Sequence, residues 1–192
     1  ANAEVLPFRF ETFVGHVETY VKEIEELVET TRAETLKHNR LVESGAYALA
    51  MDPKDGLQPP KAKSPVPHIS FASVNNAVVA LRAAAKAADS AVATAEASDH
   101  LNVAIAQLER AMTSDEGLPR RPWFRHQVYA PGFYTGYGVK TLPGIREAAE
   151  ELKWDEMNEQ MIRVAAMMNA VTDAMNTIKN AASMGPVEET AR

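Results

Sequence analysis

The chain has 192 residues, of which 46% are apolar, and a formal net charge of −6 at pH 7. It has no cysteine, which excludes disulfides, a thiol nucleophile and a thiolate metal site. The acidic balance argues against a general nucleic-acid surface, and no apolar run approaches the roughly 20 residues that span a bilayer. We therefore expect one domain over residues 1–192, without nucleic-acid or membrane contact.

The first predicted helix is marked by apolar residues that recur four and three positions apart, with glutamates between them. This spacing predicts a narrow apolar seam on one face of the helix and a solvated acidic face on the other. The seam consists of Phe13, Val17, Tyr20, Ile24 and Leu27, and we expect the helix to continue towards Gly45.

A proline-rich segment and two further helices come next. Residues 51–69 contain five prolines, which forbid a helix interior and predict an exposed linker. Apolar residues over 74–95, many of them alanine, predict a second helix that a neighbour can approach closely. A third helix is predicted from Asp99, the expected N-cap, to a point near Gly117.

The clearest helical pattern lies over residues 154–178, after a short predicted helix at 145–152. Two heptad positions are apolar throughout, and methionine fills many of them. The stripe could form a docking groove, but its combination with valine and isoleucine favours a core. Four such seams bury one another most simply in an all-α fold, an up-down four-helix bundle.

Residues 117–145 form the least regular part of the sequence. This segment, which lies between the third and fourth long helices, holds five of the nine glycines, four of the eleven prolines and six of the thirteen aromatic residues. Long loops in small domains are usually functional, so we expect the functional contact here. Arg120, Arg121 and Arg125 could grip a phosphate or a base, but salt bridges to the acidic helices are the favoured interpretation.

Catalytic signatures are missing from the sequence. The five histidines lack metal-ligand spacing, and neither a nucleophile-elbow motif nor a phosphate-binding glycine loop occurs. Acidic pairs fall on the polar faces of predicted helices, where solvated carboxylates are expected. We therefore predict that the chain is not an enzyme by itself and holds no metal.

The segment Gly117–Ile145 also carries a family resemblance. Its Gly-Leu-Pro-Arg-x-Pro-x-x-Arg-His, Val-Tyr-Ala-Pro and Leu-Pro-Gly-Ile motifs resemble the C-terminal domain of the glutamate carboxypeptidase II (prostate-specific membrane antigen) and transferrin receptor family. The opening Val-Leu-Pro-Phe at residues 5–8 and Leu-Glu-Arg-Ala at 108–111 are also similar. The resemblance runs from residue 5 to about residue 178 and leaves the proline-rich linker unmatched.

The resemblance implies a helical dimerisation domain that pairs two copies of its parent protein. In the carboxypeptidase branch, this domain lends a loop to the substrate pocket, where a Lys-Tyr pair meets the substrate's C-terminal glutamate. The aligned positions here are Gly136 and Tyr137, so the tyrosine is present and the lysine is replaced. Lys140 is a candidate substitute. The remaining family-marker and interface candidates are Arg121, Trp123, Arg125, His126 and Tyr129.

The resemblance also implies what the chain lacks. Zinc and the catalytic carboxylate of the family belong to a preceding peptidase domain, which we expect as a partner in the same parent chain. By resemblance, the parent is a type II membrane protein whose domain faces the outside or a lumen. The alternative parent is a receptor-like, non-enzymatic member; Tyr-Ala-Pro and Leu-Pro-Gly-Ile favour the carboxypeptidase branch.

Overall fold

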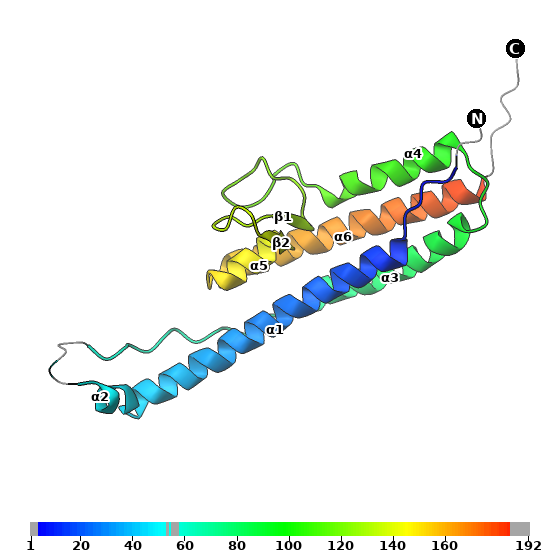
Figure 1. Ribbon diagram of the computed structural model, residues 1–192. Helices are drawn as coiled ribbons and strands as arrows, with labels where there is room; N and C mark the ends of the chain where they lie inside the picture. Colours follow the sequence, from blue (N-terminus) through cyan, green and yellow to red (C-terminus); the bar gives the residue numbers. More distant parts are fainter. Residues whose placement is uncertain (1–3, 53, 55–57, 185–192) are drawn as a thin grey trace, which may run out of the picture.

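Helices form most of the structure. The computed structural model describes residues 4–52, 54 and 58–184 (Figure 1). The elements are α1 (Phe10–Glu43), α2 (Ala46–Ala50), α3 (Ala72–Val92), α4 (Asp99–Gln107), the 3₁₀ helix η2 (Leu108–Met112), β1 (Tyr129–Pro131), β2 (Val139–Thr141), α5 (Pro143–Glu150) and α6 (Trp154–Ser183). The all-α prediction is therefore confirmed, apart from two strands of three residues each.

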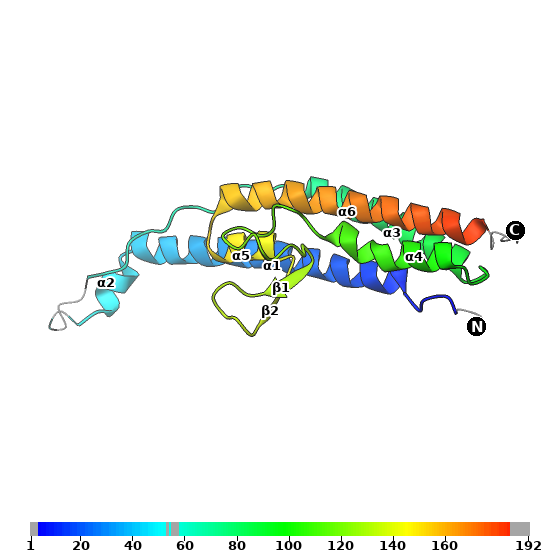
Figure 2. The ribbon, with the colours of Figure 1, turned by 90° about the horizontal axis from the view of Figure 1, so that it is seen from above.

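The long helices lie side by side and share one core. Helix α3 packs along α6 and also against α1, while α4, η2 and α5 pack against α6. The chain reverses direction between α1 and α3, between α3 and α4, and again between α4 and α6 (Figures 1 and 2). Among the described helices, none combines the length and the apolar character that a membrane crossing requires.

The methionine stripe of α6 lies in the core, as predicted. The side chains of Met161, Met168 and Met175 are almost fully buried, and so are those of Val164 and Val171 between them. Methionine is flexible enough to fill the irregular space between α3, α4 and α5. The stripe is therefore not available as a docking groove.

The prediction for α1 is wrong about which face of the helix is buried. Val17 and Ile24 are buried as expected, but Phe13 and Tyr20 are only half-buried at its edge. The buried row is Phe10, Val14, Val17, Val21, Ile24 and Val28. Both rows step by four and three and share Val17 and Ile24. The large apolar side chains of Phe13 and Tyr20 favoured the row that is only half-buried. Their bulk is accommodated at the rim, beside the row of branched side chains.

The proline-rich linker has no helix over residues 58–70, but the prediction that it is exposed is wrong at two positions. Val66 and Ile69 are buried and join the core. The Arg32 guanidinium donates hydrogen bonds to the carbonyl oxygens of Val66 (2.7 Å) and Pro67 (3.0 Å). These contacts hold the returning chain along α1.

The third helix is shorter than predicted. Its α-helical part ends at Gln107, and a 3₁₀ turn carries the chain to Met112. The N-cap is Ser98 rather than Asp99, and the Ser98 hydroxyl accepts a hydrogen bond from the Leu101 N–H at 3.2 Å. Residues 113–142 then leave the helical layer and form the candidate site.

Candidate functional site

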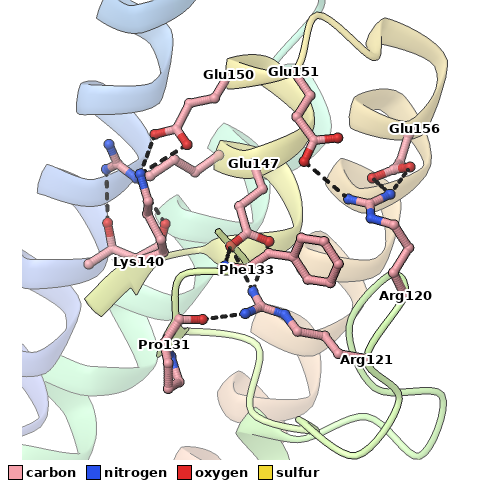
Figure 3. Close-up of polar contacts among 11 residues, drawn as sticks. Arg120, Arg121, Pro131, Phe133, Lys140, Glu147, Glu150, Glu151 and Glu156 are labelled. Carbon is pink, nitrogen blue, oxygen red and sulfur yellow. Dashed lines mark hydrogen bonds and ion pairs between the residues drawn. The ribbon is translucent and has the colours of Figure 1, made fainter. Parts of the chain in front are cut away.

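A buried ion pair organises the segment between η2 and α5. The guanidinium of Arg121 donates from one nitrogen to both carboxylate oxygens of Glu147, at 2.8 Å each. A second guanidinium nitrogen donates to the Pro131 carbonyl, and Glu147 also accepts the Phe133 N–H at 2.8 Å (Figure 3). Both side chains are more than nine-tenths buried. This cluster ties the segment's first turn, its central hairpin and α5 together.

The segment contains a β-hairpin that the sequence did not predict. Strands β1 and β2 are antiparallel, with Ala130 opposite Lys140 at the centre of the pairing. The Gly132 N–H donates to the Gly138 carbonyl at 2.8 Å and closes the turn. The available signal was two short runs rich in β-formers on either side of glycines, but three-residue strands are too short for a period-two pattern.

The tip of this hairpin presents aromatic side chains to solvent. Tyr137 is fully exposed and Tyr134 is 76% exposed. Gly136 has φ of +62°, a left-handed conformation that glycine adopts without strain and that carries the turn into Tyr137. Two of the three pocket candidates, Gly136 and Tyr137, therefore lie at the outermost point of the hairpin.

Lys140, the third pocket candidate, lies at the base of the hairpin. Its ammonium contacts both carboxylate oxygens of Glu150 on α5, at 2.7 and 2.9 Å (Figure 3). The ion pair fixes β2 on the helical scaffold. In this conformation the ammonium points towards Glu150 on α5, and Lys140 lies three residues after Tyr137 along the chain.

The basic group is used in ion pairs, as the sequence analysis favoured. Besides Arg121, Arg120 contacts both carboxylate oxygens of Glu156 on α6, at 2.7 and 2.9 Å. Arg125 contacts Asp115 within the segment at 3.0 Å, and both of these side chains are largely exposed. The acidic partners from α5 and α6 could not be found from the sequence, because nothing marks them among the many surface glutamates.

His126 and Tyr129 lie against each other at the start of β1. Their ring centroids are 4.1 Å apart, and the Tyr129 hydroxyl donates to Glu109 at 3.3 Å. Burial lowers the pKa of His126, an effect that the Glu109 carboxylate opposes. Burial and the same carboxylate raise the pKa of Tyr129.

The five family-marker candidates thus separate by exposure. Arg121 is 3% exposed, whereas Trp123 is 72% exposed. Tyr129 and Arg125 are also exposed, and His126 is half-buried. Within the part of the chain that the structure describes, no three histidine, aspartate or glutamate side chains gather as a metal site requires. The segment is therefore suited to contacts with another surface.

Comparison with known proteins gives a match to a family model and matches to named relatives. A sequence model of the transferrin receptor-like dimerisation domain matches residues 69–176. The chain is 36% identical over 72 residues to the probable glutamate carboxypeptidase LAMP1 of Arabidopsis thaliana, a match that covers 34% of this chain and 11% of that protein. It is 31% identical over 96 residues to a probable glutamate carboxypeptidase of Arthroderma benhamiae, which covers 46% of this chain and 13% of that protein. The matches span only a small part of these relatives.

Proposed function

The chain belongs to the transferrin receptor-like dimerisation domain family, and from this premise we propose that its β1–β2 hairpin borders the substrate pocket of a larger carboxypeptidase that pairs through this domain. The relatives that are named probable glutamate carboxypeptidases support a parent of that kind. The chain itself supplies self-association and one wall of the pocket, and it does not catalyse hydrolysis alone.

The observation that carries this proposal is the exposed tip of the hairpin. Tyr137 has no covering side chain, and its hydroxyl is free to donate a hydrogen bond to a carboxylate on a neighbouring surface. The exposed aromatic side chains of Tyr134 and Tyr137, close together at the end of a braced hairpin, form a surface that suits contact with another domain. A pocket in an adjoining peptidase domain would provide that contact.

The scaffold behind the hairpin supports the same proposal. We consider α1, α3, α4 and α6 an up-down four-helix bundle, since α3 packs on both α1 and α6 and α4 packs on α6. Helix α5 lies between this bundle and the hairpin, and it carries Glu147 and Glu150, the two carboxylates that hold the hairpin. The tip therefore projects from a rigid base.

Substrate recognition at this tip would rest on a neutral hydrogen bond. Gly136 occupies the position of the family's lysine, and Lys140 is paired with Glu150 at the hairpin base. Tyr137 is then the chain's own contact to a substrate carboxylate, without a cation beside it. The zinc of the reaction would be held by the parent's peptidase domain, because the described residues of this chain offer no cluster of ligands.

The test is a Tyr137→Phe substitution in the full-length parent, assayed on peptides with a C-terminal glutamate. Loss of a hydrogen bond to a charged group removes about 1.5–3 kcal/mol, so we expect kcat/KM to fall at least about tenfold. Tyr134→Phe is the matched control, because Tyr134 is another exposed tyrosine of the same turn. An unchanged kcat/KM for Tyr137→Phe would remove the substrate role and leave a hairpin that only packs against its neighbour.

A further inference from the structure

The imidazole of His126 accepts two backbone hydrogen bonds at the start of β1. Its Nδ1 accepts the Val128 N–H at 3.2 Å and the Tyr129 N–H at 3.3 Å. An imidazole nitrogen accepts hydrogen bonds only while it carries no proton. The contact therefore requires the neutral ring, with its proton on Nε2.

The groups around the ring would stabilise a positive charge on it only weakly. The charged and titratable groups that face it are Glu109 from η2, whose carboxylate oxygen is 4.0 Å from Nε2, and Tyr129 from β1. Glu109 is largely exposed, so water screens its charge. Thr113 pairs with His126 through the backbone and adds no charge. The buried Nε2 has no hydrogen-bond partner in the described structure.

A proton on Nδ1 would face the two N–H donors directly. The ring would then leave its position, and the Val128 and Tyr129 N–H groups would lose their acceptor. These residues are where the hairpin joins the helical layer, since the neighbouring Gln127 N–H donates to the Met112 carbonyl at 2.9 Å. Loss of the ring contact would loosen the hairpin at its first strand and leave α6 and its core intact.

We propose that His126 is an acid-sensitive clasp, which positions the first strand of the hairpin while its ring is neutral and releases it when the ring is protonated. The clasp would act on the hairpin whichever surface the hairpin contacts. This proposal therefore does not depend on the proposed role of the hairpin in a substrate pocket.

The direction of the pH effect follows from the burial of the ring. In the open hairpin the ring titrates near its ordinary pKa of 6.5, whereas burial lowers the pKa in the closed hairpin. The open form therefore binds protons more readily than the closed form. The clasp's contribution is complete above the ordinary pKa and is lost as the pH falls through the lowered value.

Amide hydrogen exchange of the 192-residue chain tests the clasp. Between about pH 7.5 and about pH 4.5, the protection factors of the Val128 and Tyr129 amides should fall by up to about tenfold for each pH unit between the ordinary pKa of the ring and its lowered pKa in the closed hairpin, and they should level off below the lowered value. The amide of Val171 in α6 serves as a reference and should keep its protection. Equal protection of Val128 and Tyr129 across this range would overturn the proposal.

Two variants separate the clasp from a general acid effect. His126→Asn keeps a side-chain oxygen near the position of Nδ1 but cannot take up a proton, so the two amides should stay protected at acid pH. Glu109→Gln removes the carboxylate that favours the charged ring, so the midpoint of the loss should move to lower pH. An unchanged pH dependence in His126→Asn, or a midpoint that moves to higher pH in Glu109→Gln, would contradict the assignment to His126.

Discussion

Replacing Arg121 by methionine is expected to destabilise the chain by about 3–5 kcal/mol. The substitution leaves the carboxylate of Glu147 buried, with the Phe133 N–H as its remaining strong partner. It also removes the donor to the Pro131 carbonyl on β1. Chemical denaturation followed by circular dichroism measures the change in the free energy of unfolding.

Two further variants isolate the buried charge as the cause. Arg125→Met breaks an exposed ion pair with Asp115 and should cost less than about 1 kcal/mol. The double variant Arg121→Met with Glu147→Met removes both buried charges and should recover most of the lost stability. If the double variant is as unstable as Arg121→Met, the loss arises from packing and not from an unpaired carboxylate.

Gly117→Ala should destabilise the chain by about 2–4 kcal/mol, which lowers the melting temperature by about 5 °C or more. Gly117 has φ of +65°, and a Cβ atom there would overlap the backbone of Pro122. Backbone atoms cannot move aside as a flexible side chain can, so the turn that presents Arg121 would have to open. Thermal unfolding checks the size of the effect.

Gly136→Ala, in the tip of the hairpin, is the control for the Gly117 substitution. Gly136 has a similar φ of +62°, but nothing lies within 4 Å of the position that a Cβ atom would take. The substitution should cost only the backbone strain, about 1–2 kcal/mol. Equal losses at Gly117 and Gly136 would mean that the contact with Pro122 contributes nothing.

The helices could be predicted where their apolar rows were unambiguous. Helix α6 was placed correctly because two heptad positions, three and four residues apart, carry apolar side chains that lie in the core, as Met168 and Val171 illustrate. On α1 two rows were possible, and the one with Phe13 and Tyr20 lay one position away from the buried row. Burial of the linker at Val66 depends on a return path along α1, which no local pattern encodes.

The position of the irregular segment between the helices was predicted, but its internal structure was not. Glycine, proline and aromatic content located the segment, and the family resemblance singled out Arg121 and Tyr137 within it. The partner of Arg121 lies 26 residues away on a helix, and Glu147 looks like any solvated glutamate in the sequence. The hairpin contacts the rest of the domain through that pair, through Lys140 with Glu150 and through hydrogen bonds to His126, so tertiary contacts rather than propensity account for its three-residue strands.

Sedimentation velocity of the chain tests its role as a self-association module most directly. Specific interfaces bury more than about 1,000 Å², and the apolar and aromatic side chains that this chain leaves exposed, such as Trp123, can contribute to one. Over a concentration range from about 1 μM to about 500 μM, we expect a sedimentation coefficient that rises from the monomer value towards that of a dimer. A single monomer species across the whole range would contradict the claim that this domain pairs by itself.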